Sequence, residues 1–395
     1  MARRIKMSYN EKISHVKGSA SAGLMEKVQI MKSQGKNIVS LAGGEPNFDT
    51  PEKIRQAAIK ALNEGKTHYA VGPGIIKLRE RIAKKLREEN DIECNADQII
   101  VTPGGKFAIY LAVRAMINAG DEVMILEPAW VSYGPIVEVS NGVPVYVSLI
   151  SENDYKVTRD SLESAYSEKT RMLIINYPNN PTGKILSREE AEIIKDFALD
   201  HNVMILSDEI YERIIYDRQK SWSPASFKEI SSHVITVNGF SKAVAMTGWR
   251  LGYLQAAPEV IQTIYKLYIH TVTGTSTFIQ EAAVTALDCR DEIEEMRRIY
   301  EEHRNYFISE LNKIPEIYAE KPDGAFYAWV RFETGGKDSF EIAENLLNRA
   351  GVVGVPGQAY GLQYEKYIRF SFAADMKTLK EVLERLKRYL GDRKR

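Results

Sequence analysis

Short apolar runs that alternate with longer amphipathic stretches constrain the fold of this chain more than any other feature. Between these runs lie helical patterns such as 187–201, where Ser187 stands as the N-cap and Glu190 follows three residues later. Apolar strands that alternate with helices predict an α/β fold with a mostly parallel sheet covered by helices on both faces. The expected strands are Glu122–Leu126, Val143–Val147, Arg171–Asn176, Val203–Ser207, Val234–Val237 and Leu251–Gln255.

The character of the sequence changes after about residue 285. The later segments, together with a helix near the N-terminus, predict a smaller α+β domain built from both chain ends. Its expected elements are a helix around 24–34, a long charged helix at 291–312, strands at 326–330 and 368–372, and a helix at 377–390. We therefore expect three segments: 1–49 from the small domain, 50–285 as the large domain, and 286–395 from the small domain.

Charge and cysteine content narrow the class of partner. Lys and Arg number 53 and Asp and Glu number 53, so the zero net charge argues against nucleic acid or an acidic membrane as partner. No run of apolar residues is long enough for a membrane span, and the N-terminal MARRIKMSYNEK lacks the apolar core of a signal peptide. Cys94 and Cys289 have neither metal-site nor disulfide-framework spacing, so we expect a reduced, cytoplasmic protein without a metal site.

Two cations stand in the mostly small and apolar stretch TVNGFSKAVAMTGWR, residues 236–250. A single lysine such as Lys242 is ordinarily a surface residue, but its apolar flanks weaken that reading. In an apolar pocket beside another cation, a lysine has a lowered pKa and acts as an amine nucleophile. Arg250 needs an anion, and the obvious choices are a carboxylate or a phosphate.

A candidate anion cradle precedes this stretch. Residues 101–106 read VTPGGK and lead into the helical pattern FAIYLAVRAM. A Gly-Gly turn at a helix N-terminus presents free N–H groups to an anion, although an ordinary strand–turn–helix would look the same. The spacing fits neither a Walker A loop nor the GxGxxG dinucleotide fingerprint.

Three further stretches carry polar residues where α/β folds place ligands. Asp208 ends a buried strand in VMILSDEIY and Tyr211 follows three residues later, with a helix N-cap as the alternative role for Asp208. In NYPNNPTGK, a cis bond at Asn180-Pro181 would aim the Asn180 side chain sharply. Arg369 in YIRFSFA either forms a core ion pair or binds a substrate carboxylate, and the sequence leaves both open.

The order of these motifs resembles the fold-type I aminotransferases of class I and II, which use pyridoxal 5′-phosphate (PLP). The motifs follow in the order GGK, EPAWVSY, PNNPTG, SDEIY, SKAVAMTGWR and IRFSFA. The resemblance extends from LAGGEP at 41–46 to the C-terminal helix, and it is strongest to the prokaryotic-type aspartate aminotransferases. It implies a large PLP-binding domain and a homodimer with shared active sites.

The resemblance also implies a role for each matching residue. Lys242 would bond covalently to PLP, Asp208 would pair with its protonated pyridine nitrogen, and Trp130 would stack on its ring. Asn180 and Tyr211 would hydrogen-bond its phenolic oxygen. The phosphate would be held by the backbone of Gly105 and Lys106, by Ser241 and Arg250, and by Tyr69 of the neighbouring subunit.

Substrate binding follows from the same resemblance. Arg369 would bind the α-carboxylate with help from the Gly44 N–H, and Trp130 and Asn180 would border the substrate. Lys242 would then move the proton released from the substrate's Cα. Ping-pong kinetics are expected, because the first product leaves before a second oxo acid binds.

Two departures from the family pattern affect the expected substrate. Gly239 stands where many relatives carry a serine, so one phosphate hydroxyl is absent. The segment IHTVTGTSTFI at 269–279 holds no arginine for a distal carboxylate. Arg114, on the helix after GGK, is the candidate cation instead, with a helix-surface arginine as the alternative. Ser19 and Ser21 could supply hydroxyls near the substrate.

The leading expectation is transamination of L-aspartate with 2-oxoglutarate. An aromatic or broad-specificity aminotransferase is the main alternative, because a pocket without a distal arginine admits Tyr or Phe. A C–S lyase or an aminocyclopropanecarboxylate synthase-like enzyme would hold PLP with the same motifs. A transcription regulator is disfavoured, since only about 40 residues precede LAGGEP, too few for a DNA-binding domain.

Overall fold

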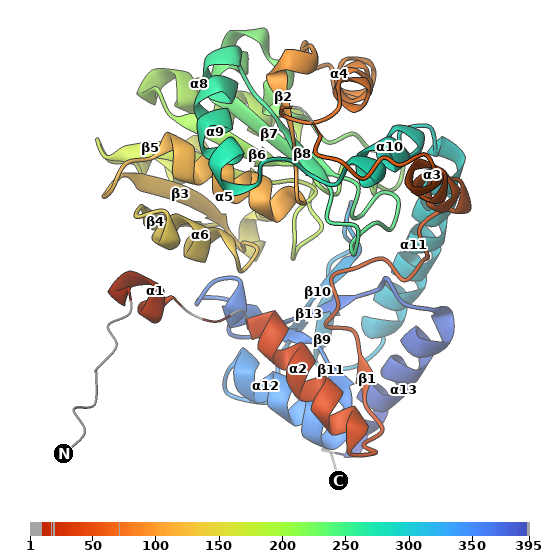
Figure 1. The fold of residues 1–395 in the computed structure, drawn as a ribbon. Helices are drawn as coiled ribbons and strands as arrows, with labels where there is room; N and C mark the ends of the chain where they lie inside the picture. The colour runs from red at the N-terminus through yellow and green to blue at the C-terminus, as the bar shows by residue number, and fades with distance from the viewer. Residues whose placement is uncertain (1–9, 17, 19, 71, 393–395) are drawn as a thin grey trace, which may run out of the picture.

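The computed structural model describes residues 10–16, 18, 20–70 and 72–392. Its larger part is built on a seven-stranded sheet in which β8 runs antiparallel to both neighbours and the other pairings are parallel (Figure 1). The strands in spatial order are β2 (Ile99–Thr102), β8 (Gly252–Gln255), β7 (Val234–Gly239), β6 (Met204–Asp208), β5 (Thr170–Asn176), β3 (Glu122–Glu127) and β4 (Val143–Ser148). The six expected strands are all present, whereas β2 was not singled out from the sequence.

The central strands are apolar because both faces of the sheet are covered. In β5, Met172 and Ile174 join a core with helices from one face, while Leu173 and Ile175 join a core with helices from the other. The first face is covered by α5 (Gly105–Met116), α6 (Tyr133–Val139) and α9 (Pro258–Thr271). The second is covered by α3 (Glu52–Asn63), α4 (Ile76–Asn90), α8 (Arg188–His201) and α10 (Thr277–Ala286). The predicted α/β class is confirmed.

The expected helix N-terminus at Ser187 is confirmed. The Ser187 hydroxyl accepts the Glu190 N–H at 3.2 Å, and the Glu190 carboxylate accepts the Ser187 N–H at 3.1 Å. This reciprocal pair is a capping box, which satisfies two backbone donors that the first turn leaves free.

Both chain ends contribute to the smaller part. The parallel pairing of β1 (Val39–Ser40) with β11 (Val352–Val353) joins the N-terminal segment to the C-terminal one. An antiparallel sheet lies beside them in the order β12 (Val355–Pro356), β13 (Tyr367–Ser371), β10 (Tyr327–Phe332) and β9 (Ile317–Ala319). Its helices are α2 (Ala20–Ser33), α12 (Ser339–Asn345) and α13 (Met376–Asp392).

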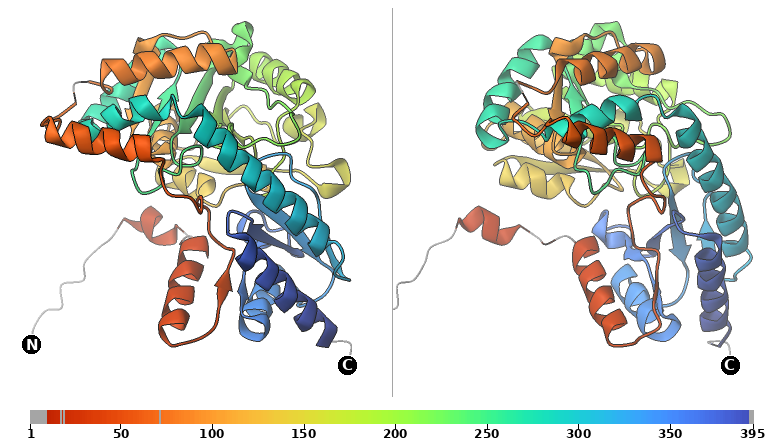
Figure 2. Two further views of the ribbon diagram at one scale, coloured as in Figure 1. Left: turned by 90° about the vertical axis from the view of Figure 1, so that its right-hand side faces the viewer. Right: turned by 45° about the vertical axis from the view of Figure 1, so that its right-hand side comes forward.

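Helix α11 (Arg290–Leu311) spans the two parts, as the side views show (Figure 2). The exact domain boundaries near residues 50 and 285 stay a prediction. Two short helices, α1 (Glu11–His15) and α7 (Arg159–Glu163), complete the α-helices of the described residues. Ser19 and the side chain of Ser21 lie outside the described residues, as do residues 1–9.

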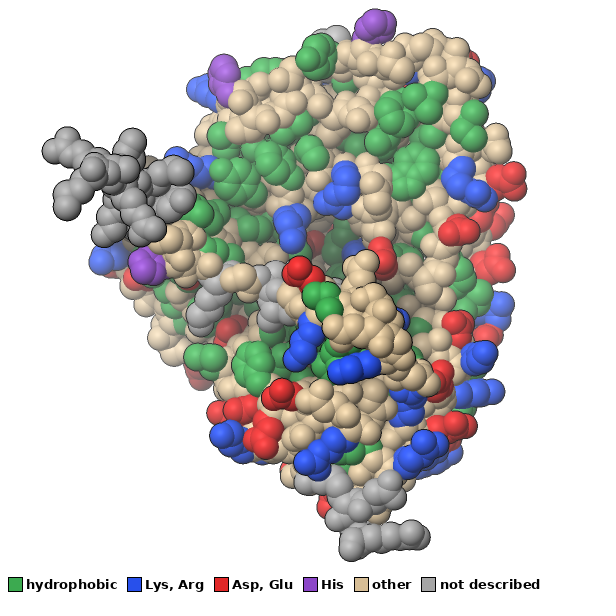
Figure 3. Space-filling view, turned by 60° about the horizontal axis from the view of Figure 1, so that its bottom comes forward, with side chains coloured by type: hydrophobic (Ala, Val, Ile, Leu, Met, Phe, Trp, Pro, Cys, Tyr) green, Lys and Arg blue, Asp and Glu red, His purple; other side chains and the backbone are tan. Residues whose placement is uncertain are grey.

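The surface carries both signs of charge. On the face shown in Figure 3, basic and acidic side chains are interspersed over the smaller part of the molecule. Among the described helices, none combines the length and the apolar character that a membrane crossing requires.

Candidate active site

A cavity of about 470 Å³ lies where β5, β6 and β7 end, and β10 and β13 of the small sheet close its other side. Parallel sheets bind ligands at this edge, because their strand ends and the following loops converge there. All but two of the predicted site residues line the cavity: Gly44, Gly105, Lys106, Trp130, Asn180, Asp208, Tyr211, Ser241, Lys242, Arg250 and Arg369. Residues from seven separate stretches of sequence are thereby brought together, as the order of the motifs predicted.

Asp208 ends β6 at the base of the cavity, opposite Asn176 of β5. Its side chain is 6% exposed, and burial raises the pKa of the carboxyl to about 6. The Tyr133 hydroxyl donates to Oδ2 at 2.7 Å and the Ile210 N–H donates to Oδ1 at 3.2 Å, and both bonds oppose that rise. A carboxylate held in this way suits a cationic partner inside the cavity.

Lys242 follows the end of β7 and reaches into the same cavity, where its amine donates to the Gly44 carbonyl. Burial lowers the pKa of the amine to about 8, and the charges of Arg369 and Arg250 act in the same direction. Glu45 and Asp208 oppose the shift. A substantial fraction of this lysine is therefore a neutral amine near pH 8, which is the reactive form.

An anion cradle forms where α5 begins. Gly104 has a φ of 87°, and a Cβ at this position would lie 2.7 Å from Nη2 of Arg250. The guanidinium therefore stands directly beside the free N–H groups at the helix N-terminus. Gly252 lets this loop approach the sheet, since a Cβ there would lie 2.6 Å from the Gly105 nitrogen. Helix dipole and guanidinium together favour a phosphate-like group.

Close packing explains the glycine at position 239. A Cβ on Gly239 would lie 3.0 Å from both the Gly252 Cα and the Leu251 carbonyl oxygen. A serine here would require its neighbours on β8 to shift by a few tenths of an ångström, and β8 in turn supports the cradle through Gly252. The departure from the family pattern thus accompanies a tight contact between the two strands.

Arg369 lies on β13 and is only 4% exposed. Its Nη1 donates to Asn180 Oδ1 at 3.0 Å, its Nη2 donates to the Ala42 carbonyl at 2.7 Å, and its guanidinium lies 4.3 Å from the Tyr327 ring centroid. The described residues supply it with no carboxylate, and its Nε has no hydrogen-bond partner. The core ion pair is thereby ruled out for the described chain, and a buried cation remains that lacks an anion.

The cis bond that the sequence allowed at Asn180-Pro181 is not found. The cis X-Pro bonds of the described residues are Glu127-Pro128 and Tyr177-Pro178. Asn180 is instead fixed by hydrogen bonds, because its N–H donates to Asn176 Oδ1 at 2.9 Å and its side-chain oxygen accepts from Arg369.

Two predicted site residues lie away from this cavity. Tyr69 is 86% exposed, ahead of α4. Arg114 is exposed on α5 and does not line the cavity, so within this chain it is not placed to bind a substrate there. Lys106 provides a cation inside the cavity instead. Its amine lies 4.8 Å from the Trp130 ring centroid, its pKa is lowered by burial and by Arg250, and no described carboxylate pairs with it.

Sequence reasoning missed two tyrosines in the cavity. Tyr133 was quoted within EPAWVSY without a role, yet its hydroxyl binds Asp208. Tyr327 lies on β10, and its hydroxyl shares a 2.7 Å hydrogen bond with that of Tyr211. A tyrosine in a quoted motif was the available signal for Tyr133, whereas FYAWV carried no comparable signal for Tyr327.

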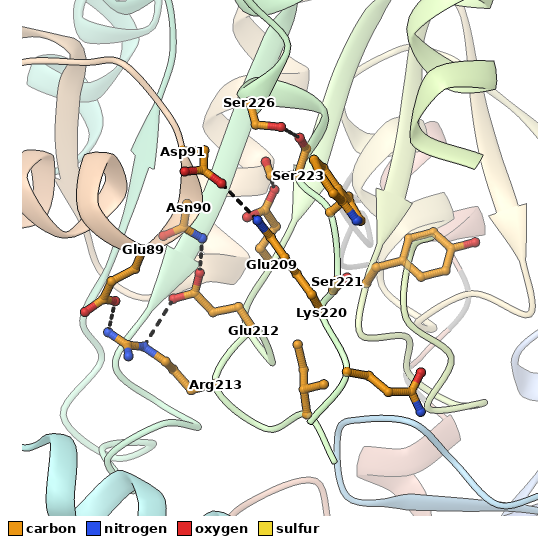
Figure 4. Close-up of a pocket in the computed structure, with 14 residues that line it drawn as sticks. Glu89, Asn90, Asp91, Glu209, Glu212, Arg213, Lys220, Ser221, Ser223 and Ser226 are labelled. Carbon is orange, nitrogen blue, oxygen red and sulfur yellow. Dashed lines mark hydrogen bonds and ion pairs between the residues drawn. The ribbon is translucent and has the colours of Figure 1, made fainter. Parts of the chain in front are cut away.

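A second cavity, of about 370 Å³, lies behind the turn that carries Asp208 and Tyr211 (Figure 4). Glu212 pairs there with Lys85 of α4 and accepts from Asn90 at 2.5 Å, and Arg213 pairs with Glu89. These contacts bind the turn to α4 from the side opposite the active cavity.

Glu209 is the most deeply buried carboxyl of this second cavity, at 5% exposed. Its Oε1 accepts from the Ser207 hydroxyl at 2.9 Å and from the Ser223 hydroxyl at 2.5 Å. Burial raises its pKa from 4.5 to about 7, the charge of Glu212 adds to the rise, and the two serines and Lys85 oppose it.

This raised pKa predicts a pH-dependent stability. Between about pH 5 and pH 7 folded Glu209 holds a proton that the unfolded chain has released, so its contribution to the free energy of unfolding falls as pH rises. Glu209→Gln keeps the shape and removes the titration. Urea unfolding measures the free energy of unfolding at each pH. Between pH 5 and pH 8, this free energy should fall by up to roughly 3 kcal/mol more in wild type than in the variant. Parallel pH curves for the two proteins would refute the prediction.

Comparison with known proteins adds the family context. The family described as "Aminotransferase class I and II" matches residues 36–386. The chain is 42% identical to aromatic-amino-acid aminotransferase 2 of Thermococcus litoralis and 42% identical to an aspartate aminotransferase of Pyrococcus abyssi, over 91% of this chain and 93% of each relative. The solved aspartate aminotransferase of Thermus thermophilus with maleate superposes with a TM-score of 0.93 at 35% identity, covering 97% of this chain and 100% of that one.

Proposed function

Since the chain belongs to the class I and II aminotransferases, we propose that it transfers the amino group of L-aspartate to 2-oxoglutarate, giving oxaloacetate and L-glutamate. The observation that carries this proposal is the cavity itself. It combines an amine with a lowered pKa, an anion cradle and a buried arginine that lacks an anion. The similarity to relatives named aspartate aminotransferase supports the choice of donor.

The cavity residues fit the PLP that this family uses. The cradle of Gly105 and Arg250 matches a phosphate, and Ser241 borders it. At the other end, the buried Asp208 carboxylate matches a protonated pyridine nitrogen. Lys242 stands in the same cavity, where its amine would bond to the cofactor's aldehyde carbon.

The residues of this chain then divide the work of the reaction. Arg369 lines the cavity and binds the substrate's α-carboxylate through its guanidinium, which Asn180 Oδ1 helps to hold in place. This anchor holds the Cα–H bond in a fixed orientation, an effect that favours loss of that proton over loss of other groups. Lys242 takes the proton from Cα. PLP, when bound, supplies the electron sink that makes this proton removable.

Tyr211 and Trp130 complete the proposed cofactor site. Tyr211 is 5% exposed, and its hydroxyl points into the cavity beside that of Tyr327, which leaves it available to a phenolic oxygen. Trp130 also lines the cavity, where its ring can stack on a planar ligand.

We also propose that the enzyme is a cytoplasmic homodimer with shared active sites. The exposure of Tyr69, 86%, supports this, since a tyrosine so placed is free to reach the phosphate site of a neighbouring subunit. Light scattering should give twice the mass of the 44.7 kDa chain, and a monomer of full activity would refute the proposal.

A half-reaction tests the proposed function directly. PLP-loaded enzyme is mixed with L-aspartate and no oxo acid, and oxaloacetate release is compared with cofactor content. One oxaloacetate per cofactor is expected, and a second oxo acid should then restart turnover. Release of ammonia and pyruvate from an S-substituted cysteine, with no second oxo acid consumed, would point to a C–S lyase instead. The absence of any product from L-aspartate would rule out aspartate as the donor.

An aromatic donor is the second candidate, because the Thermococcus litoralis relative is named an aromatic-amino-acid aminotransferase. The same half-reaction with L-tyrosine decides between a single specificity and a broad one. The Trp130 ring and the aliphatic stem of Lys106 offer an apolar wall on which an aromatic side chain could pack.

Lys106→Met should separate the two donors. The Lys106 amine is the cavity cation that faces the space beside Trp130, so it is placed to bind a side-chain carboxylate. We expect kcat/KM for aspartate to fall about 10- to 100-fold, with less than about 3-fold change for tyrosine. Arg114→Met is the matched competitor. If Arg114→Met lowered kcat/KM for aspartate and Lys106→Met did not, Arg114 would be the residue that binds the side-chain carboxylate.

A further inference from the structure

The Tyr133 hydroxyl makes the shorter of the two hydrogen bonds that the Asp208 carboxylate accepts from the described residues. This hydroxyl donates to Oδ2 at 2.7 Å, whereas the Ile210 N–H donates to Oδ1 at 3.2 Å. Tyr133 is 2% exposed and Asp208 is 6% exposed, so water does not compete strongly for this bond. Hydrogen bonds to a buried charged group are among the strong ones in proteins.

The phenol acts as the donor in this pair. Burial and the neighbouring Asp208 charge raise the pKa of Tyr133 well above 10, so the hydroxyl keeps its proton at any working pH. A donor to the ionised form of a carboxyl lowers the pKa of that carboxyl. Tyr133 therefore opposes the effect of burial, which alone would make Asp208 a stronger base.

The position of Tyr133 is fixed by the segment that also delivers Trp130. Tyr133 begins α6, its N–H donates to the Trp130 carbonyl at 3.1 Å, and the two rings pack edge to face at 5.3 Å. Because both rings line the cavity, one short turn places an aromatic wall and a hydroxyl donor at once. The backbone hydrogen bond and the ring contact with Trp130 both fix the position of the phenol, so its hydroxyl restricts the orientation of the Asp208 carboxylate.

We propose that Tyr133 is a positioning residue that acts through Asp208: its hydroxyl holds the carboxylate in one orientation and keeps it a weak base, so that a proton shared with the cofactor stays on the pyridine nitrogen. This inference rests on the proposed function. Without the hydroxyl, Asp208 would compete for that proton and could rotate away from the ring. The electron-accepting form of the cofactor would then be less populated.

A double-mutant cycle on PLP binding tests the inference in the full-length protein. Tyr133→Phe is combined with Asp208→Ala, which leaves no acceptor for the phenol. In the Asp208 background, Tyr133→Phe should raise the dissociation constant for PLP about 10-fold and lower kcat at least as much. In the Asp208→Ala background, the same change should alter PLP binding less than about 2-fold. Equal effects in both backgrounds, or none in either, would overturn the inference.

A second measurement needs no cofactor. In the cofactor-free protein, the infrared carboxyl band of Asp208, assigned by its loss in Asp208→Ala, should titrate about one unit higher in Tyr133→Phe. An unchanged titration would overturn the inference. If wild type failed to bind PLP, the proposed function would be refuted. The titration would still decide whether Tyr133 lowers the pKa of the Asp208 carboxyl.

Tyr364→Phe is the matched control for loss of a buried phenol. Tyr364 is 3% exposed, and its hydroxyl donates to the Leu149 carbonyl at 2.8 Å, outside the active cavity. Its removal should lower the melting temperature without changing PLP affinity or the titration of Asp208. A change in PLP affinity equal to that of Tyr133→Phe would assign the effect to general destabilisation and overturn the inference.

Discussion

Replacing Lys242 with alanine is expected to lower kcat by a factor of roughly 10⁴ or more, with the protein still folded. The reason lies in what surrounds the amine. Burial and the two arginines of the cavity hold its pKa at about 8, so it exists partly as a free base beside the cofactor site. A methyl group at this position can neither bond to the cofactor nor accept a proton from Cα.

The readout for Lys242→Ala should separate bond formation from proton transfer. After treatment with borohydride, intact mass should show PLP fixed to the wild-type chain and not to the variant. Equilibrium dialysis should still detect PLP bound without a covalent bond, because Arg250 and Asp208 remain. If the variant retained more than about 1% of kcat, Lys242 would not be the base.

Lys184→Ala provides the control for loss of a lysine near the site. The Lys184 amine pairs with Asp154 and, at 3.2 Å, with Glu320. Burial lowers the pKa of this amine, but the two carboxylates outweigh burial and raise it. It therefore stays charged where Lys242 does not. We expect its removal to leave kcat within about 3-fold of wild type. The contrast would show that environment, and not residue type, makes Lys242 reactive.

The sequence was most informative where the chemistry is local. Apolar runs predicted six strands of the large sheet, and the serine and glutamate at 187 and 190 predicted a capping box. The motif order predicted which residues meet in one cavity, since each motif lies at or near the end of an element. These signals depend on short spacings, which a single sequence displays directly.

Contacts between distant segments could not be predicted in the same way. The hydrogen bond from Tyr133 to Asp208 joins residues 75 apart, and the one between Tyr211 and Tyr327 joins residues 116 apart. Arg114 and Lys106 both lie on α5, but the helix turns only Lys106 toward the cavity. Strand β2 has four residues, all buried, so it offers no period from which to identify it.

Arg369→Met is expected to reduce kcat/KM roughly 30- to 3,000-fold for every amino-acid donor, because each donor carries the α-carboxylate that this arginine binds. The effect should not depend on the donor's side chain, unlike that of Lys106→Met. Arg369→Lys should recover only part of the loss, since an ammonium cannot form the paired hydrogen bonds of a guanidinium. Competitive inhibition by simple carboxylates such as acetate should also weaken in Arg369→Met, because they bind to the same arginine.

Arg369→Met is expected to lower activity strongly but to change the free energy of unfolding only slightly. A buried cation without a counter-anion costs free energy, which its carbonyl, amide and ring contacts offset only in part. In the ligand-free protein, Arg369→Met should therefore not lower the free energy of unfolding by more than about 1 kcal/mol. Urea unfolding without substrate measures this directly, and added dicarboxylate should stabilise wild type but not the variant.

Arg304 is the control for the stability test, because it is a buried arginine that has a carboxylate partner. It is fully buried, Asp217 accepts from both of its terminal nitrogens, at 2.9 and 3.0 Å, and the Pro322 carbonyl accepts as well. Arg304→Met should cost about 2–3 kcal/mol of stability, because it leaves a buried carbonyl without a donor. Its effect on kcat/KM should be small. If Arg369→Met were as destabilising as Arg304→Met, the guanidinium on β13 would be a structural group and not a binding site held ready for an anion.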